Sequence, residues 1–122
     1  MKKFKFSKRS KKSLKGVHPS LVNVMTLALG LSEVDFIVTE GVRSEGRQRK
    51  LLKAGKAQTM ESKHLTGHAV DVTAYVKDKK WKHYYKIAEA VEEASNRLGV
   101  STTWVGSRTF KDGGHFQLTY RI

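Results

Sequence analysis

The sequence contains no cysteine, a single proline and no long uninterrupted apolar run. Without cysteine the chain can form no disulfide and offers no thiolate to a metal ion. Its most apolar stretch, LVNVMTLALGL, is interrupted by Asn23 and Thr26 and is too short to span a bilayer. The basic N-terminus before it lacks a convincing cleavage site downstream, so we expect no signal peptide and no membrane span.

Acidic residues are also scarce, since 24 Lys and Arg stand against 11 Asp and Glu and give a net charge of +13. A surface this basic attracts polyanions, among them the anionic bacterial envelope, nucleic acids and lipid surfaces. The 122 residues suffice for one hydrophobic core but not for two. We therefore expect a monomer with a single domain over residues 1–122. Residues 1–16 would form a basic N-terminal segment, held to the body by Phe4 and Phe6.

Hydrophobic periodicity and end signals predict a mixed α+β chain. His18, Pro19 and Ser20 form a plausible helix start, while Ser44 is a candidate N-cap and Gly55 a terminator for a second helix. The expected helices cover residues 18–30, 44–54 and 81–98, and the expected strands cover residues 36–42, 69–76, 102–106 and 115–120. The economical interpretation is one α+β domain without repeats or linkers.

Two short stretches carry the chemistry of the chain: SKHLTGHAVD at residues 62–71 and DGGH at residues 112–115. His64, Asp71 and His115 can supply two imidazoles and a carboxylate to a zinc ion while leaving one coordination position open. Asp112 lies beside the third ligand in sequence and is a candidate base. These residues therefore form a candidate catalytic metal site.

The spacing of the first two ligands requires a turn between them. In one continuous strand His64 and Asp71 would point to opposite faces, because side chains alternate along a strand. Gly67 permits a turn or bulge there. After it, Ala69, Asp71 and Thr73 would share one face, opposite the pair formed by Val70 and Val72.

An alternative metal site would use His64 and His68, which would share one face of a helix at positions i and i+4. This motif normally has a glutamate after the first histidine, whereas Leu65 stands there. Gly67 and the AVDVTAYV run also favour a strand over a helix. We therefore expect His68 at the rim or in solvent, and we interpret His18 and His83 as ordinary structural histidines.

The motifs resemble those of phage endolysins of the L-alanyl-D-glutamate peptidase type, which share the zinc fold of D-alanyl-D-alanine carboxypeptidases and the Hedgehog signalling domain. The resemblance is carried by SKHLTGHAVD, by GVRS at residues 41–44, by Gln48 and by FKDGGHFQL near the C-terminus. It implies a small antiparallel sheet packed with helices. One departure is the segment VGSRTF after Trp104, where the family often has a Trp-Gly-Gly-Asp-Trp type sequence.

The resemblance also implies roles for individual residues. It implies zinc held by His64, Asp71 and His115, Asp112 as the catalytic base, and Arg43 as a substrate or oxyanion contact; the plainer interpretation of Arg43 is an exposed arginine at a strand end. The implied substrate is the peptidoglycan stem peptide, cut between L-alanine and D-glutamate, which leads to cell lysis. The implied location is the host cytoplasm until a separate pore-forming protein gives access to the periplasm and the cell wall.

Three alternatives remain open from the sequence. The zinc motifs do not separate an endopeptidase from a D-alanyl-D-alanine carboxypeptidase that acts on the same stem peptide. The basic clusters at residues 8–15 and 43–53 also suit a non-catalytic nucleic-acid-binding domain, although no recognised nucleic-acid-binding signature is present. A purely structural zinc domain is disfavoured because such sites usually close the fourth position and favour cysteine.

Overall fold

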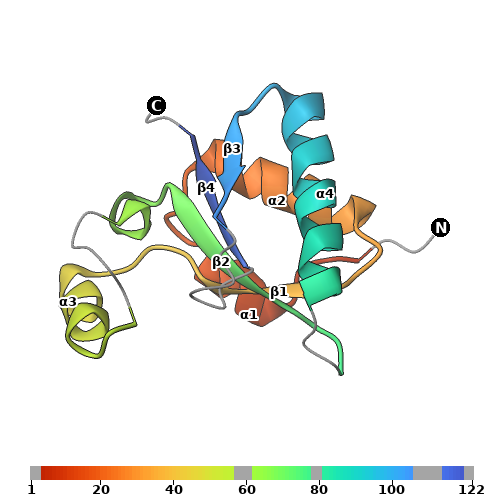
Figure 1. The fold of residues 1–122 in the computed structure, drawn as a ribbon. Helices are drawn as coiled ribbons and strands as arrows, with labels where there is room; N and C mark the ends of the chain where they lie inside the picture. The colour runs from red at the N-terminus through yellow and green to blue at the C-terminus, as the bar shows by residue number, and fades with distance from the viewer. Residues whose placement is uncertain (1–3, 57–61, 78–80, 106–113, 120–122) are drawn as a thin grey trace.

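The computed structural model describes residues 4–56, 62–77, 81–105 and 114–119. Its helices are α1 (Lys8–Ser13), α2 (Pro19–Leu31), α3 (Glu45–Lys53) and α4 (Trp81–Leu98), with a short 3-10 helix, η1 (Lys63–Thr66). Its strands are β1 (Phe36–Glu40), β2 (Ala69–Ala74), β3 (Thr102–Trp104) and β4 (His115–Leu118). The expected α+β class is confirmed (Figure 1).

The strands form one sheet in the order β1-β2-β4-β3, and every neighbouring pair is antiparallel. β2 therefore lies between β1 and β4, and the three run side by side through the middle of the molecule (Figure 1). Asp71 of β2 pairs with Glu40 of β1 on one side and with His115 of β4 on the other. The register thus brings the second and third expected metal ligands onto directly opposed positions.

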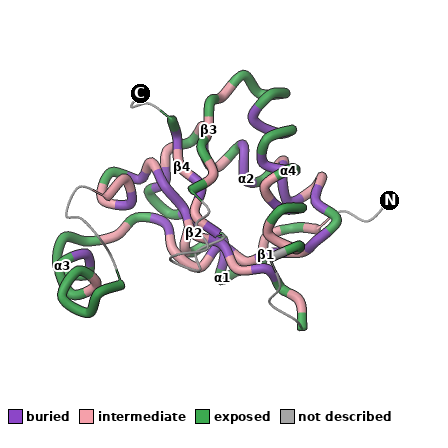
Figure 2. The backbone as a smooth tube through the Cα atoms, viewed as in Figure 1, coloured by how far each residue is buried: buried purple, intermediate pink, exposed green. Residues whose placement is uncertain are grey.

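The two faces of β2 serve different purposes. Val70 and Val72 are buried in the hydrophobic core, whereas Asp71 and Thr73 between them are only partly buried. Helices α2 and α4 pack against each other, and their buried residues belong to the same core (Figure 2). The predicted alternation is confirmed from Val70 to Ala74 and leaves Asp71 on the face of the sheet that points away from the core, whereas Ala69, predicted on the same face as Asp71, is buried.

Helices α2, α3 and α4 confirm the sequence prediction closely. α4 has the predicted bounds, and α3 begins after Ser44, whose side-chain oxygen accepts a hydrogen bond from the backbone N–H of Arg47 at 3.1 Å. The two strands whose predicted ends are described are each two residues shorter than predicted, because β1 ends at Glu40 and β2 at Ala74. None of the described helices is long and apolar enough to cross a membrane.

The basic N-terminal segment contains a helix, α1, that the sequence analysis did not predict. Its sequence, KRSKKS, has no apolar period, but Ser7 caps it and Ser10 is buried and accepts a hydrogen bond from the backbone N–H of Val38 at 3.0 Å. Phe4 and Phe6 pack against the core, which confirms the expected attachment of this segment.

Candidate metal centre

His64 is held by the short helix η1 and by the loop that follows β1. Ser62 caps η1 by accepting a hydrogen bond from the backbone N–H of His64 at 3.1 Å. The backbone carbonyl of His64 accepts a hydrogen bond from the N–H of Arg43 at 2.9 Å, and its ring Nδ1 lies 2.8 Å from the carbonyl oxygen of Gly41. With 1% of its surface exposed, the His64 ring is fixed on both sides.

The turn predicted at Gly67 is present and allows His64 and Asp71 to meet. Gly67 ends η1 in the left-handed conformation, with φ of 77°. A Cβ atom there would lie 2.6 Å from the carbonyl oxygen of Gly16, so both the backbone angle and the close approach of another segment require glycine. β2 begins two residues later.

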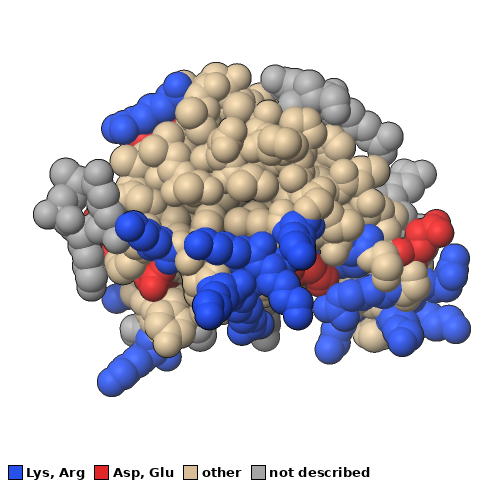
Figure 3. All heavy atoms as spheres, turned by 180° about the vertical axis from the view of Figure 1, so that it is seen from behind, with Lys and Arg blue, Asp and Glu red and all other residues tan. Residues whose placement is uncertain are grey.

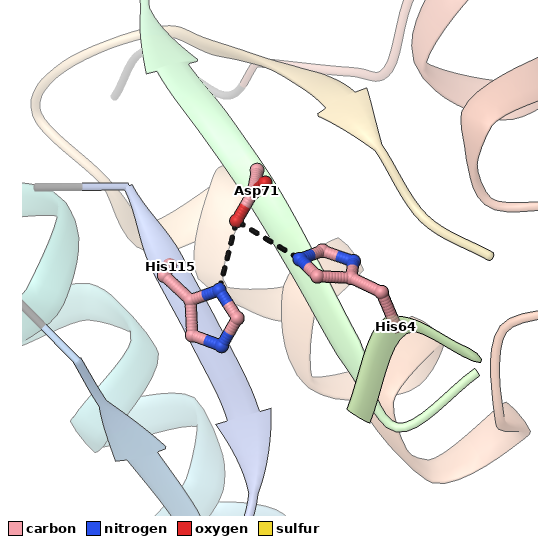
Figure 4. Close-up of side chains that lie close together, drawn as sticks. All are labelled: His64, Asp71 and His115. Atoms are coloured by element: carbon pink, nitrogen blue, oxygen red, sulfur yellow. Dashed lines mark hydrogen bonds and ion pairs between the residues drawn. The ribbon is translucent and has the colours of Figure 1, made fainter. Parts of the chain in front are cut away.

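The three predicted ligands converge from three elements: η1, β2 and β4 (Figure 4). His64 Nε2 lies 3.2 Å and His115 Nδ1 lies 2.9 Å from the same oxygen, Asp71 Oδ1. One ligand atom from each residue lies within 4.8 Å of the others, and this is the one group of at least three such side chains found among the described residues. The grouping predicted from sequence is confirmed.

The hydrogen bonds on the far sides of the two rings indicate which nitrogen of each ring faces the centre as a lone pair. Because the carbonyl of Gly41 can only accept, the proton of His64 is on Nδ1, and its buried Nε2 has no hydrogen-bond partner. His115 lies between two acceptors, with Nε2 2.9 Å from Gln117 Oε1 and Nδ1 2.9 Å from Asp71 Oδ1. In the neutral tautomer that carries its proton on Nε2, bonded to Gln117, the lone pair of Nδ1 faces the centre.

Two imidazole lone pairs and one carboxylate oxygen therefore point at one another, which is unfavourable unless a cation lies between them. A metal ion satisfies all three acceptors at once, and the bonds to Gly41 and Gln117 are of the kind that orients metal-ligating histidines. The residues present thus fit a metal ion bound by two nitrogens and one oxygen.

Arg43 lies directly behind Asp71. Its Nη2 donates to Asp71 Oδ2 at 3.3 Å, its Nε to Glu40 Oε2 at 2.8 Å and its Nη1 to Gln48 Oε1 at 2.7 Å. Only 10% of the Arg43 side chain is exposed, and Gln48 is buried. The guanidinium is therefore a fixed cation that binds the oxygen of Asp71 not shared by the histidines. Arg47 completes the network by binding Glu40 from the exposed side.

The network keeps both acidic groups ionised. Burial alone would raise the pKa of Asp71, but in the chain without a metal ion, protons on the facing nitrogens of His115 and His64 supply hydrogen bonds and positive charge that outweigh burial and hold that pKa well below its usual range. Burial likewise opposes ionisation of Glu40, yet hydrogen bonds from Arg47 and Arg43 lower its pKa. Asp71 is thus a carboxylate at neutral pH, as a metal ligand must be.

The remaining histidines named in the sequence analysis lie outside the cluster. His68 Nδ1 lies 2.8 Å from Thr66 Oγ1, and its ring lies 5.4 Å from that of His18, which caps α2. His83 lies on α4 and is not among the grouped ligands. Asp112, the candidate base, and most of the atypical segment after Trp104 lie outside the described residues.

Comparison with known proteins identifies the family. A model of the phage L-alanyl-D-glutamate peptidase family matches residues 2–119. The chain belongs to this family. It is 31% identical to the L-alanyl-D-glutamate peptidase of Escherichia phage T5, with 94% of this chain and 98% of that protein covered. The crystal structure of the Serratia marcescens L-Ala D-Glu endopeptidase ChiX superposes with a TM-score of 0.87 at 48% identity, covering 98% of this chain and 93% of that one.

Membership of the phage L-alanyl-D-glutamate peptidase family decides between alternatives that the motifs left open. The chain is an L-alanyl-D-glutamate peptidase, so the endopeptidase prediction is confirmed over the D-alanyl-D-alanine carboxypeptidase and over the binding domain without catalysis. The α+β fold with its small antiparallel sheet is shared with ChiX. The zinc motif alone could not make this choice, because it describes the metal and not the peptide.

In this phage peptidase, Gln117 and Glu40 are neighbours of the site that sequence reasoning missed. A signal for Gln117 was available, because residues i and i+2 of a strand share a face and His115 opens the predicted strand. Glu40 gave no comparable signal, since its bond to Arg43 depends on the loop after β1. Gln48 was noted only as part of the resemblance, and its contact with Arg43 supplies the physical reason.

Proposed function

We propose that this chain is a zinc-dependent peptidoglycan endopeptidase that cleaves the L-alanyl-D-glutamate bond of the stem peptide and so lyses the host bacterium. The observation that carries the proposal is the convergence of His64 Nε2, Asp71 Oδ1 and His115 Nδ1 in a member of this peptidase family. Residues 1–122 would act as one catalytic domain and as a monomer.

Zinc suits this ligand set better than other common metals. Two imidazoles and one carboxylate are typical of catalytic zinc sites in hydrolases, whereas magnesium and calcium favour oxygen ligands throughout. When bound, zinc would supply a Lewis acid that polarises the scissile carbonyl and activates water near neutral pH. His64 and His115 would hold the ion, with ring orientations supported by Gly41 and Gln117.

Asp112 and Arg43 would contribute to hydrolysis without binding the metal. Asp112 stands three residues before His115 in sequence, and as a base it would accept the proton of the attacking water and return it to the leaving amine. Arg43 would fix the carboxylate of Asp71 and keep a cation near the site for a substrate carboxylate or the developing oxyanion. Its hydrogen bonds to Glu40 and Gln48, which hold the guanidinium in place beside Asp71, favour the positioning role.

Membership of the phage peptidase family supports a proposal for the setting of the reaction. The enzyme would be made in the host cytoplasm and would reach the wall after a separate pore-forming protein opens the inner membrane. Its net charge of +13 favours association with the anionic envelope.

The test is digestion of isolated peptidoglycan by the purified protein, with zinc and with a chelator, and analysis of the products by mass spectrometry. New N-terminal D-glutamate ends that disappear on chelation and return with zinc would support the proposal. Free D-alanine, or digestion that persists after zinc is removed, would contradict it.

Two variants separate the roles of individual residues. Asp112→Ala is expected to retain zinc and fold while losing about a hundred- to ten-thousand-fold in rate, the usual contribution of a general base. His68→Gln, in the same motif but outside the cluster, is the matched control and should retain both zinc and activity. Unchanged hydrolysis by Asp112→Ala would remove this residue from the mechanism.

A further inference from the structure

A groove on the surface of the N-terminal part of the chain is separate from the metal site. It encloses about 530 Å³ between the N-terminal segment, α1 and α2, a volume within the range of small-molecule sites. Its lining consists of Phe4, Lys5, Phe6, Lys11, Leu14, Lys15, Val22, Thr26 and Leu29. We call it the α1–α2 groove.

The floor of the α1–α2 groove is apolar and firmly supported. Leu14 and Leu29 belong to the hydrophobic core, and the ring of Phe6 packs edge-to-face against Phe36 of β1 with centroids 6.2 Å apart. A second apolar hollow of about 520 Å³ meets the groove at Thr26 and continues across α2 toward Leu98, which is 44% exposed. The exposed side of α2 thus offers a continuous apolar surface.

The rim of the groove is purely cationic. Lys5, Lys11 and Lys15 are exposed, and no ion pair is found for them within the part of the chain that the structure describes. The first 32 residues contain no Asp or Glu. Seen from behind, Lys and Arg side chains gather along one edge of the molecule next to a broad surface without charged side chains (Figure 3). The charge complementary to this rim is therefore negative.

We propose that the α1–α2 groove binds an anionic phospholipid of a membrane surface, with one acyl chain on the apolar floor and the phosphate between Lys5, Lys11 and Lys15. Binding at a membrane surface depends on two signals, the apolar area that is buried and the electrostatic attraction to anionic lipids. The groove combines both signals. Cations near an anionic leaflet each strengthen partitioning about fivefold.

The position of the groove leaves the metal site free when lipid is bound. Leu14 and Leu29 face the core, on the same side of the sheet as Val70 and Val72, whereas Asp71 lies on the opposite face. A molecule docked through the groove would therefore present His64, Asp71 and His115 away from the membrane. This inference does not depend on the proposed zinc chemistry.

The first test is co-sedimentation of the full zinc-loaded chain with vesicles of phosphatidylcholine alone or mixed with phosphatidylglycerol. The chain is expected to bind only the mixed vesicles. The triple variant Lys5→Gln, Lys11→Gln, Lys15→Gln should partition about a hundredfold less, from three factors of about five. The matched control, Arg49→Gln, Lys50→Gln, Lys53→Gln on α3, removes the same charge and should bind nearly as well as the parent. Equal losses of vesicle binding in the two triple variants would overturn the proposed lipid site, because general attraction between the basic chain and the anionic vesicles would then explain the binding.

The second test addresses the acyl chain through backbone amide NMR shifts. Lysophosphatidylglycerol below its micelle concentration should shift Leu14, Val22 and Leu29, whereas glycerophosphoglycerol, which has the head group without the chain, should not. Shifts confined to the lysines, or no binding to either vesicle, would overturn the proposal; binding of an acidic peptide instead of lipid would do the same. Unchanged hydrolysis of a soluble muropeptide by the triple variants establishes that they are folded.

Discussion

At the scale of single residues, the two histidines present different nitrogens to the metal site. His64 offers Nε2 and His115 offers Nδ1, because the other nitrogen of each ring is held by an acceptor. For His64 that acceptor is a backbone carbonyl, which no substitution removes. For His115 it is the side chain of Gln117, so this half of the arrangement can be tested by mutation.

Gln117→Leu, which removes the acceptor at similar volume, is expected to weaken zinc binding about 10- to 100-fold, the usual cost of losing a partner of a metal-ligating histidine. Gln117→Glu retains the acceptor and should bind zinc nearly as tightly as the parent. Competition with a chromogenic chelator measures both affinities, and long-range proton–nitrogen NMR reports which ring nitrogen of His115 carries the proton. Parent-like affinity in Gln117→Leu would show that Gln117 does not orient the ring.

The lowered pKa of Glu40 leads us to expect that the stability of the fold depends on pH. The pKa of Glu40 is lowered from its ordinary value of 4.5 in the folded protein. The stabilisation that ionised Glu40 gives the folded state is therefore fully present above pH 4.5 and is lost as the pH falls through the lower pKa of the folded protein. The difference in unfolding free energy between the parent and Glu40→Gln should therefore shrink as the pH falls below 4.5. Urea titrations of the zinc-free protein measure it.

Glu93→Gln is the control for this prediction, because Glu93 pairs with Arg97 on the exposed surface of α4, where an ion pair contributes little. A difference in unfolding free energy between the parent and Glu40→Gln that stays constant with pH would contradict the predicted dependence of stability on the ionisation of Glu40.

The grouping of the three candidate ligands could be predicted from sequence because His64, Asp71 and His115 stand in short motifs whose geometry is local: a glycine turn, a strand period and a strand start. The partners of Arg43 could not. Its bonds to Asp71 and Gln48 join three segments, and their meeting depends on the packed sheet rather than on any local pattern.

At the scale of elements, η1 and its terminating Gly67 fix the distance between the first two ligands. Gly67→Ala is expected to lower the unfolding free energy by about 1 to 3 kcal/mol, because the methyl group would press on the carbonyl of Gly16 in addition to straining the backbone. Zinc affinity should fall with it, since η1 carries His64. Denaturant titration and chelator competition measure the two effects.

Gly55→Ala is a matched control for this substitution. Gly55 has a similar φ of 73°, but a Cβ atom there would meet nothing within 4 Å. It should therefore show only the backbone cost and leave zinc affinity unchanged. Equal destabilisation by both substitutions would mean that the contact with Gly16 carries no energy.

The long elements were predictable and the short ones were not. α4 has an amphipathic stripe and a terminating glycine, Gly99, so periodicity alone located it. α1 and η1 are each about one turn or slightly more, and capping by Ser7 and Ser62 stabilises them together with tertiary bonds such as that from Val38 to Ser10. No periodic pattern can develop over so few residues.

At the scale of the whole molecule, zinc would join three segments that are distant in sequence. Because η1, β2 and β4 each supply one ligand, binding should stabilise the folded chain against the unfolded one. At a free zinc concentration a hundredfold above Kd we expect about 2.7 kcal/mol, which raises Tm by roughly 10 °C for a chain of this size. Differential scanning calorimetry with and without a chelator measures the shift, and an unchanged Tm would contradict a ligand set that spans these elements.

The basic character of the molecule was evident from composition, but its distribution was not. Composition gives only the sum of the charges. The fold shows that α1 and the turn after it place Lys11 and Lys15 beside the apolar side of α2. In contrast, part of the positive charge of α3 is neutralised, because Arg47 forms an ion pair with Glu40.

The two faces of β2 have a consequence for how this enzyme tolerates change over generations. From Val70 to Ala74 the strand alternates between residues buried in the core and partly buried residues on the face that carries Asp71. Substitutions at Val70, Val72 and Ala74 should act mainly by reducing the amount of folded protein in the cell, whereas substitutions at Asp71 should reduce turnover far more than they reduce that amount. In a saturation library of β2 scored separately for abundance and for lysis, neighbouring positions should then differ in which of the two measurements they affect most.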